Sequence, residues 1–279
     1  MSPVPTVGCG AEAPGSLRAG SLRAPRGLRA WARRDHHAAV RLALLHGFGH
    51  TPASWAEVRA ALRTPAVDCP LPGHDPRWPV AADWDATIAA LGARVPAGAI
   101  AVGYSLGARL ALGLLAVDRV GAAILIGVNP GLADPAERAA RVAADAAWAA
   151  RLRAEGTAAF LDAWEAQPIF ATAARAPAAV RARRRATRAA LDPAGLADAM
   201  TALGLGAMPD LADALLARAD RARLIVGADD AKFAAIAAAL AARAPPLGPT
   251  VIAASGHDPT LEQPAALAAA IDALVDALR

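Results

Sequence analysis

From about residue 28 onward, short apolar runs alternate with segments of helical periodicity. Several of these runs are almost continuously apolar, which is typical of strands covered on both faces. The alternation is typical of β-α-β units that build a parallel sheet, so the sequence predicts an α/β domain over residues 28–279. The expected strands are residues 40–45, 66–69, 100–102, 120–128, 224–226 and 251–253.

Residues 131–205 interrupt this alternation, because they carry helical patterns alone. Such a segment is expected to be a helical cap inserted after a strand, since it has no strand pattern from which to build a second sheet. The helices expected in the cap are 135–153, 157–165 and 177–191. The helices expected in the rest of the domain are near 54–62, 83–93, 106–117, 232–243 and 261–278.

The formal charge of +4 belongs entirely to the first 37 residues. A nucleic-acid footprint needs a basic patch on the folded domain, so we expect no nucleic-acid partner. We interpret residues 1–27 as a disordered basic tail rich in Pro, Gly and Ala. No apolar run reaches the roughly 20 residues of a membrane span. The two cysteines, Cys9 and Cys69, form no disulfide framework, so we expect a cytoplasmic location.

One motif lies where a strand is expected to turn into a helix. Residues 103–107 read Gly-Tyr-Ser-Leu-Gly, between the apolar run 100–102 and the helical run 106–117. A sharp turn of this kind raises a serine hydroxyl above the sheet and places it at a helix N-terminus, where negative charge is favoured. The context predicts that Ser105 is a nucleophile or base.

A serine hydroxyl needs a neighbouring imidazole and a carboxylate that orients it. His257 is the only histidine after residue 74, and it follows the last expected strand. Asp229 and Asp230 both follow the strand at 224–226, and we choose Asp230 as the acid. Asp229 remains an alternative, and the aspartate that is not used is expected to cap the next helix. Because the ends of parallel strands share one edge of a sheet, the three groups are expected to meet there.

The segment 46–49 reads His-Gly-Phe-Gly and follows the first expected strand. Folds with this serine turn place the second donor of an oxyanion hole in such a glycine-rich loop. The predicted donors are the amides of Phe48 and Leu106. His46 and His74 are expected to be structural.

Several segments from about residue 40 to the C-terminus resemble one branch of the α/β-hydrolase fold, the 2-succinyl-6-hydroxy-2,4-cyclohexadiene-1-carboxylate synthase family of menaquinone biosynthesis. The serine turn is general to that fold, whereas the cap and helix motifs are more specific. The residues that carry the resemblance are Leu45–Phe48 with Trp55, the turn at 103–107 with Arg109, residues 129–132, Trp164 with Gln167-Pro168 and Phe170, Asp230 with Lys232-Phe233, and Gly256-His257 with Glu262 and Pro264.

The resemblance implies a lyase that uses the triad to abstract a proton and eliminates pyruvate, with no metal or cofactor. A substrate with several carboxylates suits guanidinium groups, which bind carboxylates through two parallel hydrogen bonds. The position of Arg109, four residues after Ser105 on one helix face, also follows from helix geometry. The substrate-binding residues implied by the resemblance are Tyr104, Arg109, Arg141, Trp164, Arg188 and Lys232.

Two other functions use the same residues. A serine hydrolase, an esterase or a C–C bond hydrolase, would use the triad covalently. A ligand receptor would use the fold without turnover. Ester turnover without pyruvate release would indicate the hydrolase, and ligand binding that survives Ser105→Ala would indicate the receptor. The oligomeric state does not follow from the sequence.

Overall fold

The computed structural model describes residues 41–279. The predicted tail at 1–27 lies outside the described residues, as do residues 28–40 at the start of the predicted domain. None of the helices in the described part is long and apolar enough to cross a membrane.

Six parallel strands form one sheet in the order β2-β1-β3-β4-β5-β6. All six were expected from the apolar runs, and the predicted α/β fold is confirmed. Every residue of β1, β3 and β4 is buried, which explains why these segments lack polar alternation. The strands are β1 (Leu42–Leu45), β2 (Ala66–Cys69), β3 (Ile100–Tyr104), β4 (Ala122–Ile126), β5 (Ala222–Gly227) and β6 (Thr250–Ile252).

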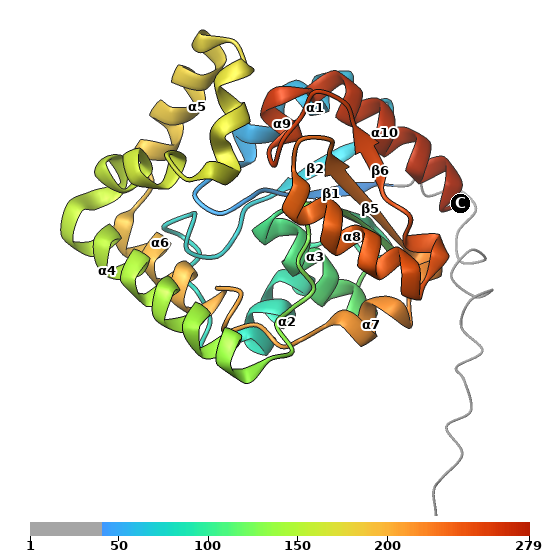
Figure 1. Ribbon diagram of the computed structural model, residues 1–279, viewed down its shortest axis with the longest axis horizontal. Coiled ribbons are helices and arrows are strands. Elements are labelled where there is room, and N and C mark those ends of the chain that lie inside the picture. The colour runs from blue at the N-terminus through green and yellow to red at the C-terminus, as the bar shows by residue number, and fades with distance from the viewer. Residues whose placement is uncertain (1–40) are drawn as a thin grey trace, which may run out of the picture. The chain divides into compact units, whose positions relative to one another are not determined.

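Helices cover both faces of the sheet (Figure 1). Alternate residues of β1 point to opposite faces: Leu42 and Leu44 pack in one apolar core, whereas Ala43 and Leu45 pack in the other. The first core includes α1 and α10, and the second includes α2, α3 and α8. The helices are α1 (Ala56–Ala61), α2 (Trp84–Arg94), α3 (Leu106–Ala116), α7 (Ala212–Leu216), α8 (Ala231–Arg243), α9 (Pro259–Glu262) and α10 (Pro264–Ala277), with 3-10 turns η1 (Pro52–Trp55), η3 (Ala219–Arg221) and η4 (Pro245–Leu247).

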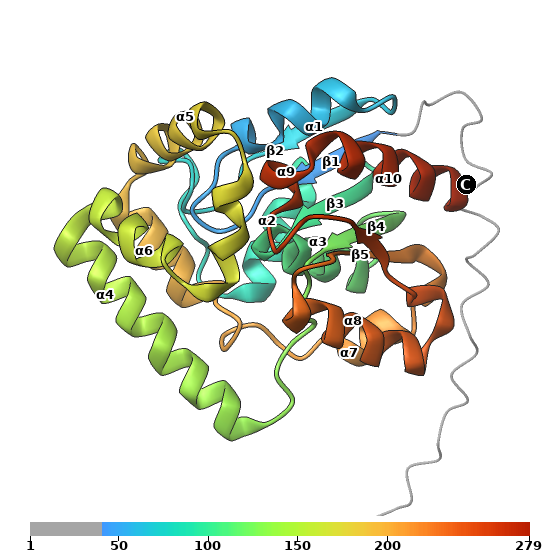
Figure 2. The same ribbon diagram turned by 45° about the horizontal axis from the view of Figure 1, so that its top comes forward.

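Residues 127–221, all of which the structure describes, contain no strand. Most of this stretch is helical, and its helices between residues 135 and 202 lie together on one side of the sheet in both views (Figure 2). They share a small apolar core that includes Leu152, Phe160 and Leu196. We keep the term cap for residues 131–205. Its elements are α4 (Pro135–Glu165), η2 (Pro168–Arg175), α5 (Ala178–Ala189) and α6 (Pro193–Ala202).

Some helix boundaries differ from the expected ones. The two runs predicted at 135–153 and 157–165 are the two arms of α4, which breaks at Gly156, where φ is 78°. The helix predicted at 261–278 is divided at Gln263, because the following Pro264 disfavours helical geometry in the residue before it. Helix α6 was not predicted. It begins with Asp192 as its cap and Pro193 in its first turn, a start signal that the sequence does contain.

Candidate active site

Ser105 occupies a strained turn between β3 and α3. Its φ and ψ are 53° and −108°, a conformation that non-glycine residues adopt rarely. The flanking glycines allow this close packing, because a Cβ on Gly103 would overlap the backbone at Gly107, and a Cβ on Gly107 would overlap the carbonyl of Leu45. The structure thus places the hydroxyl above the carboxyl edge of the sheet, as the motif predicts.

Ser105, His257 and Asp230 form a continuous hydrogen-bonded chain. The Nε2 atom of His257 lies 3.2 Å from Oγ of Ser105, and its Nδ1 lies 2.7 Å from Oδ2 of Asp230. A carboxylate at Asp230 accepts from Nδ1–H, which leaves Nε2 as the acceptor for the serine proton. Both His257 and Asp230 are buried. The chain has the geometry needed to withdraw a proton from the serine hydroxyl.

The two neighbouring aspartates have different partners. Asp230 contacts His257 with one carboxylate oxygen and accepts from the amide of Phe233 with the other, at 3.2 Å. The exposed Asp229 instead forms an ion pair with Arg175 of η2. The expectation that the second aspartate caps the following helix is therefore wrong, because Asp230 itself caps α8 while it contacts the histidine.

A glycine that the sequence analysis missed lies against the imidazole. Gly127 follows β4 with φ of 59°, and a Cβ at this position would lie 2.8 Å from Cε1 of His257. The imidazole also contacts Phe233, whose ring centroid is 4.5 Å away. Gly127 lies near the end of the expected strand 120–128, on the edge that carries the triad, and this was the signal available in the sequence.

The two amides predicted to form the oxyanion hole come from the loop after β1 and from the start of α3. Neither the Phe48 amide nor the Leu106 amide, the two predicted oxyanion donors, donates to any residue that the structure describes. The next amide in the loop, that of Gly49, donates to Nε2 of His74 at 2.9 Å. The ring of His74 is in turn held by the carbonyl of Pro72, 3.0 Å from Nδ1. This pair of bonds requires a neutral ring with the proton on Nδ1.

Burial keeps the histidines beside this loop neutral. It lowers the pKa of His74 to about 4, and it lowers the pKa of His46 to about 3, with the nearby His74 as a second cause. The rings of His46 and His74 contact each other edge to face at 5.2 Å. Their positions agree with the expected structural role, because both rings are buried and both contact this loop: Nδ1 of His46 lies 2.9 Å from the carbonyl of Gly47, and Nε2 of His74 accepts from the amide of Gly49.

A cavity of 270 Å³ opens at the serine. Its lining includes the cationic residues Arg109, Arg141 and Lys232 together with several apolar side chains. Among the described residues, no group of three His, Cys, Asp or Glu side chains is placed to hold a metal ion. The full lining is Ser105, Arg109, Gly127, Asn129, Arg141, Trp164, Gln167, Pro168, Ile169, Phe170, Leu205, Lys232, Phe233 and His257.

The two arginines of the cavity have few partners. Arg109 donates to the carbonyl of Leu203 at 2.6 Å, and Arg141 pairs with Asp145 at 2.8 Å. Burial, and then the charge of Arg141, lowers the pKa of Arg109 to about 9. The cavity therefore holds poorly compensated positive charge, which an anionic ligand with two or more carboxylates would compensate.

Two residues implied by the resemblance do not line this cavity. Tyr104 is buried with its ring centroid 5.4 Å from that of His257. Arg188 binds the carbonyl of Gly49 at 2.8 Å and the carboxylate of Glu165 at 2.6 Å. Arg188 thus contacts the loop that carries Phe48. For both residues, substrate binding stays a prediction.

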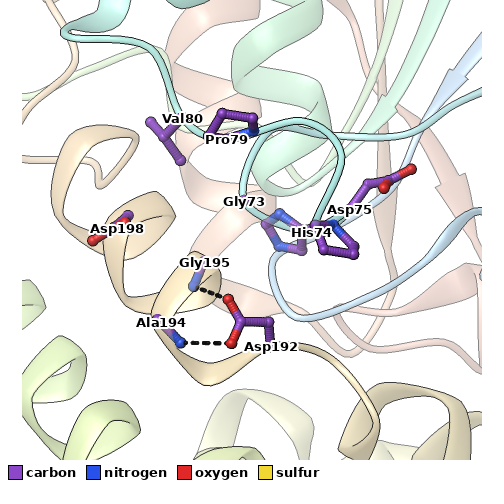
Figure 3. A pocket seen from close by; sticks show the side chains of 10 residues that line it. Gly73, His74, Asp75, Pro79, Val80, Asp192, Ala194, Gly195 and Asp198 are labelled. Atoms are coloured by element: carbon purple, nitrogen blue, oxygen red, sulfur yellow. Dashed lines mark hydrogen bonds between the residues drawn. The ribbon is translucent and has the colours of Figure 1, made fainter.

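A second cavity of 150 Å³ lies between the loop at residues 73–80 and the start of α6 (Figure 3). Asp192 faces it and accepts from the amides of Ala194 and Gly195, so its carboxylate is used as a helix cap. The cavity contains none of the predicted site residues. It marks the contact between the cap and the loop that supports His74.

Comparison with known proteins assigns this domain to a family. Residues 42–270 match the alpha/beta hydrolase family. A protein of Klebsiella pneumoniae named 2-succinyl-6-hydroxy-2,4-cyclohexadiene-1-carboxylate synthase is 35% identical over 82% of this chain and 91% of its own length. A protein of the same name from Serratia proteamaculans is 34% identical over 81% of this chain and 89% of its own length.

Solved structures agree with the fold. MenH from S. aureus superposes with a TM-score of 0.79 at 23% identity, covering 86% of this chain and 95% of that one. A thermophilic esterase from Thermogutta terrifontis superposes with a TM-score of 0.70 at 22% identity, covering 86% and 90%. The chain therefore belongs to the alpha/beta hydrolase family and, within it, to the family of 2-succinyl-6-hydroxy-2,4-cyclohexadiene-1-carboxylate synthases.

Proposed function

We propose that this protein is a carbon–oxygen lyase that eliminates pyruvate from an enolpyruvyl-succinyl cyclohexene carboxylate and forms 2-succinyl-6-hydroxy-2,4-cyclohexadiene-1-carboxylate in menaquinone biosynthesis. The observation that supports it best is the combination of a serine–histidine–aspartate chain with a cavity that carries three cations. The names of the relatives give the product. The location that we propose for this reaction is the cytoplasm.

In the proposed reaction, the triad acts as a base. His257 takes the proton of Ser105, and the serine oxygen removes a proton from the substrate carbon beside the succinyl ketone. The electron pair moves into the ketone and generates an enolate oxygen. The amides of Phe48 and Leu106 are the proposed donors to this oxygen, because neither is used by another described residue.

Collapse of the enolate completes the elimination. The ring gains its second double bond as the bond to the enolpyruvyl oxygen breaks. The group leaves as an enolate, which takes up one proton at its methylene carbon and becomes pyruvate. No acyl-enzyme is formed. Arg109, Arg141 and Lys232 are the proposed partners of the substrate carboxylates, because they line the cavity that opens at Ser105. Trp164, which also lines this cavity, is the proposed apolar contact for the substrate ring.

The test is pyruvate release from the enolpyruvyl substrate, measured with purified protein. Ser105→Ala is expected to lower kcat by about 10²- to 10⁴-fold, the usual contribution of a positioned base. Arg141→Met is expected to raise KM by about 10- to 100-fold, the range for one hydrogen bond to a charged group.

Arg151→Met is a matched control for Arg141→Met. Both arginines lie on α4, and both pair with an acid four residues later. Arg141 lines the cavity, whereas Arg151 is not among the lining residues. It should keep wild-type kinetics. If the wild-type protein hydrolyses p-nitrophenyl esters and releases no pyruvate, the lyase proposal is wrong and the serine hydrolase is the better function.

A further inference from the structure

One carboxylate, that of Glu262, links η2 of the cap to the loop that carries His257. Thr172 of η2 donates its hydroxyl to Oε1 of Glu262, at 3.0 Å. The other oxygen of Glu262 accepts from the backbone N–H of Gly256, at 2.8 Å. Because Gly256 directly precedes His257, a side chain of the cap and the backbone beside the imidazole share a single partner.

The same contact is closely packed. A Cβ on Gly256 would overlap Oγ1 of Thr172, so only a glycine allows η2 to approach the loop this closely. The segment that makes this contact also forms a wall of the cavity, because Pro168, Ile169 and Phe170 line it. One short turn of the cap therefore contacts the substrate space on one side and the histidine loop on the other.

A second attachment lies beside the acid. Arg175, three residues after Thr172, forms an ion pair with Asp229, which directly precedes Asp230. This ion pair is exposed, so we expect it to contribute little by itself. The bonds of Glu262 are half-buried, and the bond to the Gly256 amide is charge-assisted, which makes Glu262 the stronger attachment.

We propose that Glu262 is a positioning residue, which couples the docking of η2 to the placement of the His257 imidazole. This inference rests on the triad of the proposed function. Glu262 does not line the cavity, so it acts through Gly256 and not on the substrate. Loss of the Thr172 bond lets the loop shift, and the Nε2–Oγ distance of 3.2 Å between His257 and Ser105 is at the limit where a small shift breaks the bond.

The test uses Thr172→Val, Glu262→Ala and the double variant, with Thr187→Val as the control. Thr187 is an exposed threonine of the cap, and among the described residues its hydroxyl bonds within α5, to the carbonyl of Arg183. Two rates are measured for each variant: pyruvate release, and covalent labelling of Ser105 by a fluorophosphonate in the absence of substrate. Urea midpoints check that each variant is folded.

Thr172→Val is expected to lower kcat and the labelling rate by about tenfold, the equivalent of one net hydrogen bond, with KM changed by less than about threefold. Glu262→Ala lowers both rates at least as much, and adding Thr172→Val to it has no further effect, because the threonine acts through the glutamate. Thr187→Val keeps both rates.

Wild-type rates in Thr172→Val, or independent effects of the two substitutions in the double variant, would overturn the inference. A change in KM alone would also overturn it, because it would place η2 on the substrate and not on the histidine. The labelling assay separates this inference from the proposed function. If the wild type is labelled but releases no pyruvate, only the lyase function fails; if Ser105 is not labelled at all, there is no reactive triad to position and the inference fails too.

Discussion

Mild acid should destabilise this fold through the histidines under the loop that carries Phe48. His46 and His74 are neutral in the native state, with pKa values lowered to about 3 and about 4 from 6.5. Burial also lowers the pKa of His50 well below that value. Unfolding exposes all three rings to water, where they take up protons below pH 6.5.

The direction of the effect follows from proton uptake. Between pH 6.5 and about 4 the unfolded chain binds more protons than the native protein, so the free energy of unfolding falls as the pH falls. For one such imidazole, the difference between pH 7 and pH 5 is about 2 kcal/mol. His46 and His74 together then remove about 4 kcal/mol, a large part of the 5–15 kcal/mol typical of a domain.

The assay is urea unfolding followed by tryptophan fluorescence at pH 7 and pH 5. His74→Gln is the informative variant, because an amide oxygen can still accept from the Gly49 amide but does not titrate. We expect the loss between pH 7 and pH 5 to be smaller by about 2 kcal/mol in this variant than in the wild type. The window stays above pH 5 so that Asp75, with a pKa of about 2, does not contribute.

Equal losses in the wild type and in His74→Gln would refute this reasoning. Such a result would mean that the ring takes up its proton in the folded state, for example by leaving the loop. The hydrogen bond between the Gly49 amide and Nε2 would then not persist in solution at pH 5, and the geometry of the oxyanion loop would depend on pH.

Three further predictions concern the surroundings of the triad. Gly127→Ala should lower kcat at least about tenfold and stability by about 1–3 kcal/mol, because φ is 59° there and the new methyl group meets the His257 ring; kinetics and urea midpoints measure both. Arg188→Met should lower kcat more than it raises KM, because Arg188 holds the carbonyl of Gly49, and a rise in KM alone would instead place the guanidinium on the substrate. Arg184→Met should lower the free energy of unfolding in urea by about 3 kcal/mol, because this buried guanidinium donates to Ser54, Glu57 and Thr260. An unchanged urea midpoint would contradict this prediction.

The features that are set by residues close together in the sequence could be predicted. A buried strand needs an uninterrupted apolar run and a serine turn needs glycines beside it, so β3, Ser105 and the order of the triad residues could be inferred from local patterns. The predicted fold class is confirmed by the structure and by the family match.

Contacts between the cap and the sheet were not predictable in the same way. Whether Asp229 or Asp230 contacts the histidine depends on a backbone turn of one residue, and the partner of Asp229 is 54 residues away in η2. Gly256 and Thr172 are far apart in the sequence and have no pattern in common, and their contact exists only once η2 is docked. The resemblance named Arg188 for the substrate; the structure shows its guanidinium bound to Gly49 and Glu165, and substrate binding stays a prediction.

The distribution of charge explains why the cap and the sheet must act together in the proposed reaction. The sheet edge supplies the base and the proposed oxyanion amides. It also supplies two of the three cations in the cavity, Arg109 and Lys232, which lie at the starts of α3 and α8. The third cation, Arg141, comes from the cap. Arg109 and Arg141 repel each other, and this repulsion contributes, after burial, to the lowered pKa of Arg109. A polycarboxylate bound between the two arginines would attract both of them. In the proposed reaction, binding of the substrate therefore favours the docked position of the cap. Since the docked η2 also holds the loop of His257 through Glu262, the base is best placed when the correct anion fills the cavity.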